Sequence, residues 1–227
     1  YQFYEKTFYS LLKKTIGIEN GNFFPTAGAA VPDEICEFVH SVGINMLVGY
    51  GLTESTATVS CFQNSGYEIG SVGTVMPDVE VKIGENNEIL LRGKTITKGY
   101  YKKAEATAEA IDKEGWFHTG DAGYLNGDCL YLTERIKDLF KTSNGKYISP
   151  QALETKLAID RYIDQIAIIA DQRKFVSALI VPMYGFVKDY AKEKGIEYKD
   201  MEELLQHPKI IGLFRARIDT LQQQFAH

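Results

Sequence analysis

The 227-residue chain is 44% hydrophobic and 24% charged, with a formal net charge of −5 at pH 7. That length suits one large domain or two ordinary ones, and the apolar fraction is sufficient for a buried core. The negative charge provides no basic surface for nucleic acid or for an anionic membrane. No run approaches the roughly 20 apolar residues of a membrane span, so we expect a cytoplasmic protein, with peripheral attachment to a membrane as the alternative.

The cysteines and histidines do not form a disulfide framework or a metal site. The cysteines are odd in number and widely spaced, without a C-x-x-C motif, so we predict buried small hydrophobic side chains at Cys36, Cys61 and Cys129. A structural zinc is not expected, because HExxH-type spacing is missing among His40, His118, His207 and His227.

The first part of the chain predicts a helix, a strand, a turn and a second helix. An amphipathic helix is expected over residues 1–17, because its apolar side chains recur at helical spacing and Gly17 closes it. A short apolar run then leads into the small residues 28–30, which indicate a tight strand-to-helix turn that a flat ligand could approach closely. The next helix opens at Pro32, with acidic residues in its first turn, and ends at Gly43.

A strand followed by a glycine turn comes next. Residues 45–48 form an apolar strand, and Gly-Tyr-Gly-Leu-Thr-Glu follows it at residues 49–54. A strand, a glycine turn and then polar residues entering a helix often place ligands at the carboxyl edge of an α/β sheet. Two interpretations stay open: Thr53 and Glu54 contact a ligand, or Thr53 caps the next helix and Glu54 lies in its first turn.

Between residues 66 and 132 the apolar period changes to two. Residues 79–83 alternate apolar and charged side chains, and the run 88–92 returns after a polar turn, which predicts a β-hairpin. A short helix is expected over residues 103–111. We interpret this region as a small β-rich subdomain.

The stretch from residue 116 to residue 154 carries the largest number of special positions. An acidic, Gly-flanked loop at Asp121 is followed by a hairpin that turns at residues 126–128 and then by Arg135. A carboxylate can accept hydrogen bonds from a vicinal diol such as a ribose, and a guanidinium can donate a planar fork to hydroxyls or phosphate. Together they suggest a nucleotide sugar. Alternatively, Asp121 caps a turn and Arg135 pairs with a surface carboxylate.

Beyond residue 137 the composition predicts an α+β domain. A helix begins at Ser149 and Pro150, an apolar hairpin spans residues 165–181, and three further helices follow, the last two separated near Pro208.

Three motifs, in chain order, resemble the adenylate-forming enzymes. They are GYGLTES at residues 49–55, KGYYKKAEATAEA at residues 98–110, and WFHTGD with a hairpin and TERIKDLFKTSNGKYISPQALE at residues 116–154. This superfamily contains acyl-CoA ligases, firefly-luciferase-like proteins and the adenylation domains of peptide synthetases. The third motif is most similar to that of the long-chain fatty acid–CoA ligases.

The resemblance implies a fold class of α/β plus α+β. Residues 1–65 would form an α/β part of the large AMP-binding domain, residues 66–136 its β-rich subdomain, and residues 137–227 a truncated, mobile α+β lid domain. The chain begins without Met and ends within an apolar helical pattern, so we expect a fragment, the C-terminal half of the enzyme, which is inactive by itself. The Ser/Thr/Gly-rich phosphate loop and the catalytic lysine of the family are expected outside it.

The resemblance also implies a reaction in two steps. A long-chain fatty acid and ATP, with Mg²⁺, would give acyl-adenylate and pyrophosphate, and coenzyme A would then give acyl-CoA and AMP. The partners would be these small molecules and no nucleic acid. Two alternatives stay open: a ligase for another carboxylic acid, and a catalytically silent nucleotide-binding or interaction module.

The site residues follow from the same resemblance. Tyr50 would stack on adenine, Thr53 would lie at the α-phosphate and Glu54 would hold Mg²⁺. The other residues expected to bind ATP or AMP are Gly28, Ala29, Ala30, Gly51, Asp121 and Arg135.

Lys137 matches the hinge position of the family, and Gly145, Lys146 and Tyr147 match the loop that turns inward for thioester formation. Solvated lysines and a surface-packed tyrosine are the alternative. Tyr147 stands where many relatives carry Arg, and residues 143–145 make this loop one residue longer than its commonest form.

Overall fold

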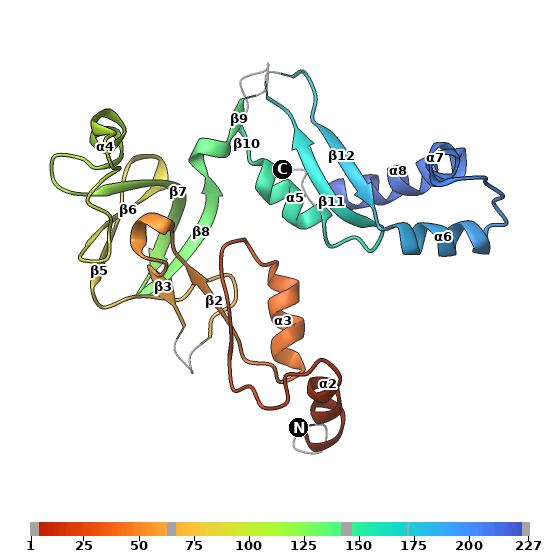
Figure 1. The fold of residues 1–227 in the computed structure, drawn as a ribbon, viewed down its shortest axis with the longest axis horizontal. Coiled ribbons are helices and arrows are strands. Elements are labelled where there is room, and N and C mark those ends of the chain that lie inside the picture. The colour runs from red at the N-terminus through yellow and green to blue at the C-terminus, as the bar shows by residue number, and fades with distance from the viewer. Residues whose placement is uncertain (1–4, 63–66, 142–146, 172, 224–227) are drawn as a thin grey trace. The chain divides into compact units, whose positions relative to one another are not determined.

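The computed structural model describes residues 5–62, 67–141, 147–171 and 173–223 of the chain (Figure 1). The chain divides into two compact units, Tyr1–Lys137 and Asp138–His227. Each unit has its own strands, helices and apolar core.

An eight-stranded mixed sheet, as far as the described residues show, forms the centre of the first unit. Its strand order is β1-β2-β3-β4-β8-β7-β6-β5; β1 and β2 are parallel, and the other neighbours pair antiparallel. The sheet thus joins strands from residues 1–65 with strands from residues 66–136. The strands are β1 (Phe24–Thr26), β2 (Met46–Tyr50), β3 (Ser60–Cys61), β4 (Thr74–Val75), β5 (Val79–Ile83), β6 (Glu88–Gly93), β7 (Phe117–Asn126) and β8 (Cys129–Arg135).

Helix α3 of this unit begins and ends where local signals predict. Helix α3 follows Pro32, carries two acidic residues in its first turn and is closed by Gly43 at φ +74°. The helix expected over residues 1–17 is shorter in the described part, and its first turn is a π-helix. The helical segments are η1 (Glu5–Tyr9), α2 (Ser10–Thr15), α3 (Asp33–Ser41), η2 (Thr53–Ser55), η3 (Glu85–Asn87), α4 (Ala104–Ala110) and η4 (Ile136–Asp138), which crosses the boundary between the units.

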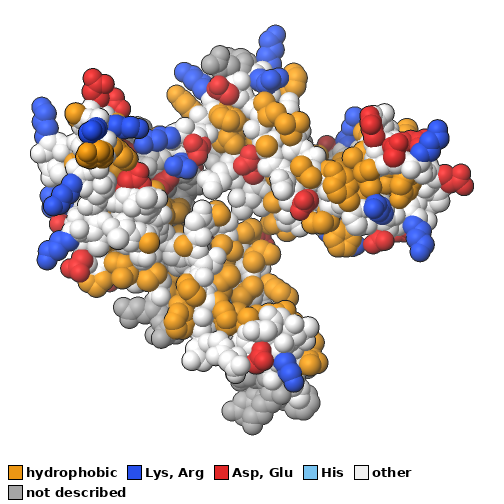
Figure 2. Space-filling model, in the orientation of Figure 1, with side chains coloured by type: hydrophobic (Ala, Val, Ile, Leu, Met, Phe, Trp, Pro, Cys, Tyr) orange, Lys and Arg blue, Asp and Glu red, His pale blue; other side chains and the backbone are white. Residues whose placement is uncertain are grey.

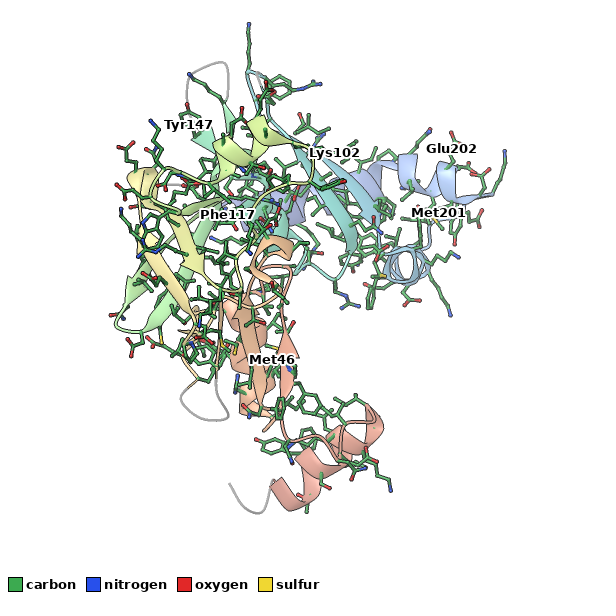
Figure 3. All side chains as sticks on the ribbon, turned by 60° about the vertical axis from the view of Figure 1, so that its left-hand side comes forward. Met46, Lys102, Phe117, Tyr147, Met201 and Glu202 are labelled. Atoms are coloured by element: carbon green, nitrogen blue, oxygen red, sulfur yellow. The ribbon has the colours of Figure 1, made fainter. Side chains whose placement is uncertain are left out.

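The core of the first unit lies on the antiparallel part of the sheet. Ile89, Leu90 and Leu91 follow one another in β6 and are all buried, so both faces of this inner strand are covered. Phe117, labelled in Figure 3, packs into the same core from β7. The predicted hairpin β5–β6 and the predicted turn between β7 and β8 are confirmed.

The prediction of three buried cysteines is correct for one of them. All three thiols are free, and Cys36 on α3 is buried. Cys61 and Cys129 are partly exposed. They lie in the two-residue strand β3 and at the start of β8, beside the hairpin turn.

The second unit contains two short antiparallel ladders and four helices within its described residues. As predicted, a helix begins at Ser149 and Pro150, and Oγ of Ser149 accepts a hydrogen bond from the amide of Ala152 at 3.4 Å. The predicted hairpin and the helix break at Pro208 are also confirmed. The elements are β9 (Phe140–Lys141), β10 (Tyr147–Ile148), α5 (Pro150–Leu157), β11 (Ile163–Ile169), β12 (Ser177–Pro182), α6 (Tyr184–Glu193), α7 (Met201–Gln206) and α8 (Pro208–Gln222).

Both units also expose large apolar side chains (Figure 2). In the first unit, Leu11 and Phe38 on α2 and α3 are each 62% exposed; in the second, Phe175 and Leu179 of the β11–β12 hairpin are 70% and 64% exposed. Among the described residues, no helix combines the length and the apolar character that crossing a membrane would require. The cytoplasmic location and the peripheral attachment both stay predictions.

Candidate functional site

Three strands of the first unit bring a carboxylate, a phenol and a guanidinium together. Asp121 lies in β7, while Tyr50 ends β2 and Arg135 ends β8. Oη of Tyr50 donates a hydrogen bond to Oδ2 of Asp121 at 2.6 Å, and Nε of Arg135 lies 3.6 Å from Oδ1 of the same carboxylate. The Asp121 side chain is 14% exposed and that of Arg135 49%, so the carboxylate is largely enclosed while the guanidinium reaches solvent.

The expected loop at Asp121 is in fact an irregular part of a strand. Asp121 pairs across the ladder with Arg135, so the antiparallel register places the two side chains together. Tyr50 reaches the carboxylate from a strand 71 residues earlier in the chain. The sequence left open that Arg135 pairs with a surface carboxylate. In the structure Arg135 forms an ion pair with the largely enclosed carboxylate of Asp121.

Tyr50 is a hydrogen-bond donor at neutral pH. Burial raises the pKa of its phenol far above the ordinary value, and the hydrogen bond to Asp121 raises it further. Its residue surface is 8% exposed, as part of the core, so most of the ring is covered here. Stacking of Tyr50 on adenine stays a prediction. The Asp121 carboxylate has about four acceptor positions, so it can bind further hydroxyl groups beside the phenol.

The loop after β2 is tightly folded and is strained at two positions. A Cβ at Gly51 would lie 1.4 Å from the carbonyl oxygen of Ala57, so this position requires glycine. Thr56 and Ala57 have φ of +55° and +81°, a region that non-glycine residues seldom adopt. Such strain is concentrated at functional sites in proteins.

The same loop holds Thr53 and Glu54. They lie in the single 3₁₀ turn η2, whose N-cap is Leu52, so the interpretation of Thr53 as the cap of a regular helix is wrong. Oε1 of Glu54 accepts a hydrogen bond from Oη of Tyr100 at 2.9 Å, and its carbonyl accepts one from the amide of Thr97 at 2.6 Å. Burial raises the pKa of Tyr100, and the bond to Glu54 raises it further.

The small residues Gly28, Ala29 and Ala30 lie on an exposed bend after β1. Gly28 has φ +92°, and a Cβ there would meet no atom within 4 Å. The backbone at Gly28 is therefore uncovered, and the contact of these three residues with adenine stays a prediction.

The residues expected to act in the second step lie at the end of the first unit and beyond it. Lys137 is the last residue of the first unit, and its side chain packs over Gly120: a Cβ there would lie 2.8 Å from Cδ and Cε of the lysine. Tyr147, labelled in Figure 3, begins β10 and is 64% exposed, with Nζ of Lys141 5.7 Å from its ring centre. Gly145 and Lys146 lie outside the described residues.

Sequence reasoning missed the residues that support this site. Tyr100, which bonds Glu54, stands inside the motif KGYYKK and could have been chosen for that reason. Thr119 and His118 stand inside WFHTGD. Glu88 accepts a hydrogen bond from the amide of Gly120, but it lies 32 residues away, and its own strand carries no signal of that contact.

Glu54 could bind a magnesium ion only together with oxygen ligands from outside the described residues. In the described ranges, no group of three or more His, Cys, Asp or Glu side chains could hold a metal ion. Mg²⁺ is usually bound by one or two carboxylates plus phosphate oxygens and water. Glu54, a single carboxylate on the strained loop, suits that arrangement.

Comparison with known proteins defines the class to which this geometry corresponds. Residues 2–101 match the family model described as AMP-binding enzyme. The resemblance of the chain to the adenylate-forming enzymes is thereby confirmed.

The curated relatives that the chain matches include acyl-CoA synthetases and long-chain-fatty-acid–CoA ligases. The chain is 30% identical to long chain acyl-CoA synthetase 7, peroxisomal, of Arabidopsis thaliana, over 98% of the chain and 34% of that protein. It is 34% identical to long-chain-fatty-acid–CoA ligase 1 of Saccharomyces cerevisiae, over 81% of the chain and 29% of that protein. The chain thus spans about a third of the length of the curated relatives it matches.

Solved structures confirm the expected fold class. The adenylation domain of a carboxylate reductase from Mycobacterium chelonae matches with a TM-score of 0.68 at 23% identity, over 88% of this chain and 30% of that one. The o-succinylbenzoate CoA synthetase of Bacillus subtilis, in complex with its acyl-adenylate intermediate, matches with a TM-score of 0.63 at 25% identity, over 76% and 39%. The mixed sheet with its helices, followed by a small α+β unit, is the fold of adenylate-forming enzymes.

Proposed function

We propose that the chain is part of an ATP- and Mg²⁺-dependent long-chain fatty acid–CoA ligase. The observation that carries this proposal is the meeting of Tyr50, Asp121 and Arg135, three motif residues far apart in the chain, at one enclosed carboxylate. The names of the curated relatives support the fatty acid as substrate and coenzyme A as acceptor.

In this proposal the cluster binds the nucleotide. Asp121 accepts hydrogen bonds from the ribose hydroxyls, since Tyr50 and Arg135 hold its carboxylate and leave acceptor positions open. Arg135, which reaches solvent, donates to the nucleotide from the other side of the carboxylate. Gly28, Ala29, Ala30, Tyr50 and Gly51 line the adenine, and Thr53 lies at the α-phosphate.

The proposed chemistry has two steps. A carboxylate oxygen of the fatty acid bonds to the α-phosphorus of ATP, and the bond from that phosphorus to the bridging oxygen breaks, so pyrophosphate leaves with the electron pair. The sulfur of coenzyme A, having lost its proton, then bonds to the acyl carbon, and AMP leaves. Mg²⁺ held by Glu54 would neutralise phosphate charge. Orientation of the two reactants contributes much of the rate.

The division of the chain gives the two steps a structural basis. We propose that residues 1–65 and 66–136 are parts of one AMP-binding domain and that residues 137–227 form a lid domain. Lys137 would be the hinge about which the lid domain moves between the two steps. Gly145, Lys146 and Tyr147 would act in thioester formation. The end of the first compact unit at Lys137 supports this role.

A ligase for another carboxylic acid is the second candidate. It is favoured by the similarity to o-succinylbenzoate CoA synthetase, which is 28% identical to this chain in its Escherichia coli form, with a TM-score of 0.56. A silent nucleotide-binding module is the third reading of the same fold.

ATP–pyrophosphate exchange by the full-length protein separates these candidates. Exchange with palmitate but not acetate is expected of the long-chain ligase, exchange with a different acid identifies the second candidate, and no exchange with any acid supports the silent module. Asp121→Ala should raise the KM for ATP about tenfold or more, the value of a lost charge-assisted hydrogen bond. Asp128→Ala, at the exposed turn of the same hairpin, is the control; an equal KM in both variants would remove Asp121 from the site.

A further inference from the structure

Strand β7 contains a bulge at the residues that carry the proposed nucleotide site. Glu88 of β6 pairs with Ala122, and Leu90 pairs with His118. Between these pairs β6 runs from residue 88 to 90, whereas β7 runs from 118 to 122, so β7 holds two extra residues. A bulge of this kind re-aims a side chain, and here the displaced segment includes Asp121.

A second irregularity lies on the opposite side of Asp121. Ala122 pairs with Glu134 and Gly123 with Leu132, so β8 holds one extra residue at this point. The regular ladder is thus interrupted at Asp121 on the β6 side and, just beyond it, between Ala122 and Gly123 on the β8 side.

The amides of the bulge residues are bonded to side chains. The amide of Gly120 donates to Oε1 of Glu88 at 2.9 Å, and the amide of Asp121 donates to Oγ1 of Thr119 at 3.0 Å. The hydroxyl of Thr119 in turn donates to the carbonyl of Ile89 on β6 at 2.7 Å. These bonds matter because buried amides without a partner are costly, and a bulge removes them from the ladder.

Glu88 is itself held in place from the other side. Its Oε2 lies 2.8 Å from Nδ1 of His118, and the carboxylate is 19% exposed at the side chain. Nε2 of His118 lies 4.0 Å from Oδ2 of Asp112, and Oδ1 of the same carboxylate accepts hydrogen bonds from the amides of Glu114 and Trp116. His118 and the carboxylate of Glu88 therefore connect the turn at Asp112 to the bulge.

Gly120 makes the bulge both possible and easy to deform. Its φ of +75° lies in the left-handed region, and the side chain of Lys137 occupies the space that a Cβ would need. A glycine has many accessible conformations, and the bond that the Gly120 amide donates to Glu88 favours this one.

We propose that Glu88 is a positioning residue of the nucleotide site: its carboxylate holds the β7 bulge in the conformation that presents Asp121 to Tyr50, to Arg135 and to the sugar of the nucleotide. This inference rests on the proposed function of Asp121. Without the bond, the Gly120 amide seeks another partner and the bulge changes shape. A displacement of about 1 Å is enough to weaken a site strongly.

The test measures AMP affinity by calorimetry in the full-length protein, with the melting temperature recorded for each variant. Glu88→Ala should weaken AMP binding about tenfold, and Glu88→Gln should recover most of the affinity, because its amide oxygen can still accept from Gly120. Glu80→Ala is the matched control: Glu80 lies on the adjacent strand β5 and pairs with Arg92 at the surface. It should bind AMP as the wild type does.

The outcomes are distinguishable. Wild-type affinity in Glu88→Ala, with Asp121→Ala impaired, overturns the role of Glu88 and leaves the proposed function standing. Wild-type affinity in Asp121→Ala overturns both. Weak binding in Glu88→Gln equal to that in Glu88→Ala also refutes a role through the Gly120 bond.

If Glu88→Ala does not fold, Glu88→Asp decides, because it keeps the charge but draws the carboxylate back from Gly120. Weaker AMP binding at an unchanged melting temperature supports positioning, and wild-type affinity refutes it. In exchange assays the KM for ATP should rise while the KM for the acid stays the same, a split that general loss of stability would not produce.

Discussion

Replacing Tyr50 by Phe removes one hydroxyl from the core of the first unit and leaves the buried ring in place. The hydroxyl donates to Oδ2 of Asp121 at 2.6 Å. Hydrogen bonds to charged groups contribute about 1.5–3 kcal/mol. Because Arg135 still lies 3.6 Å from the carboxylate, Asp121 keeps a partner, and we expect the lower end, about 1.5 kcal/mol. For a unit of this size that corresponds to a fall in Tm of about 5 °C.

Differential scanning calorimetry measures the change, and alkaline titration of tyrosine absorbance provides a second readout. The pKa of Tyr50 is raised in the folded state, so its stabilisation is complete below about pH 10, the ordinary tyrosine pKa, and is lost as pH rises toward the raised value. The variant should therefore lose less stability than the wild type in this alkaline range. Tyr124→Phe is the control, because Tyr124 is 49% exposed. Equal Tm values for the two variants would refute the contribution of the hydrogen bond.

Two further substitutions, one in each unit, test a tight loop and a buried ion pair by thermal unfolding. Gly51→Ala should destabilise the first unit by about 3 kcal/mol or more, because the new Cβ would lie 1.4 Å from the Ala57 carbonyl oxygen; a Tm close to that of the wild type would contradict the tight loop. Arg217→Met should cost about 3 kcal/mol, since it leaves the carboxylate of Asp160, whose side chain is 3% exposed, without its ion-pair partner, whereas the exposed Arg215→Met should change little.

The elements that the sequence predicted well depend on local signals. The period-two alternation of residues 79–83 gives β5, and Pro150 at the first helical position starts α5. These signals act within a few residues, so no knowledge of the rest of the chain is needed to interpret them.

The predictions that failed depend on contacts from elsewhere. Thr53 and Glu54 form a 3₁₀ turn instead of the start of a helix, because the following Thr56 and Ala57 adopt positive φ and their loop is bonded to residues 95–97. Cys61 and Cys129 are only partly buried; Cys61 is the last residue of the two-residue strand β3, and Cys129 is the first residue of β8, beside the hairpin turn. Neither outcome follows from the side chains at those positions alone.

The sequence by itself predicted that Tyr50, Asp121 and Arg135 belong to one site, because they stand in motifs that resemble one superfamily and because the chemistry of Asp121 and Arg135 suits a nucleotide sugar. The tertiary structure alone decided how they meet. The pairing of β7 with β8 places Asp121 opposite Arg135. Strand β2 belongs to the same sheet, and it brings the hydroxyl of Tyr50, 71 residues earlier in the chain, to the same carboxylate. The tertiary structure also decided that Glu88 holds the bulge, because strand register sets which side chains share a neighbourhood, and register arises from the pairing of distant segments.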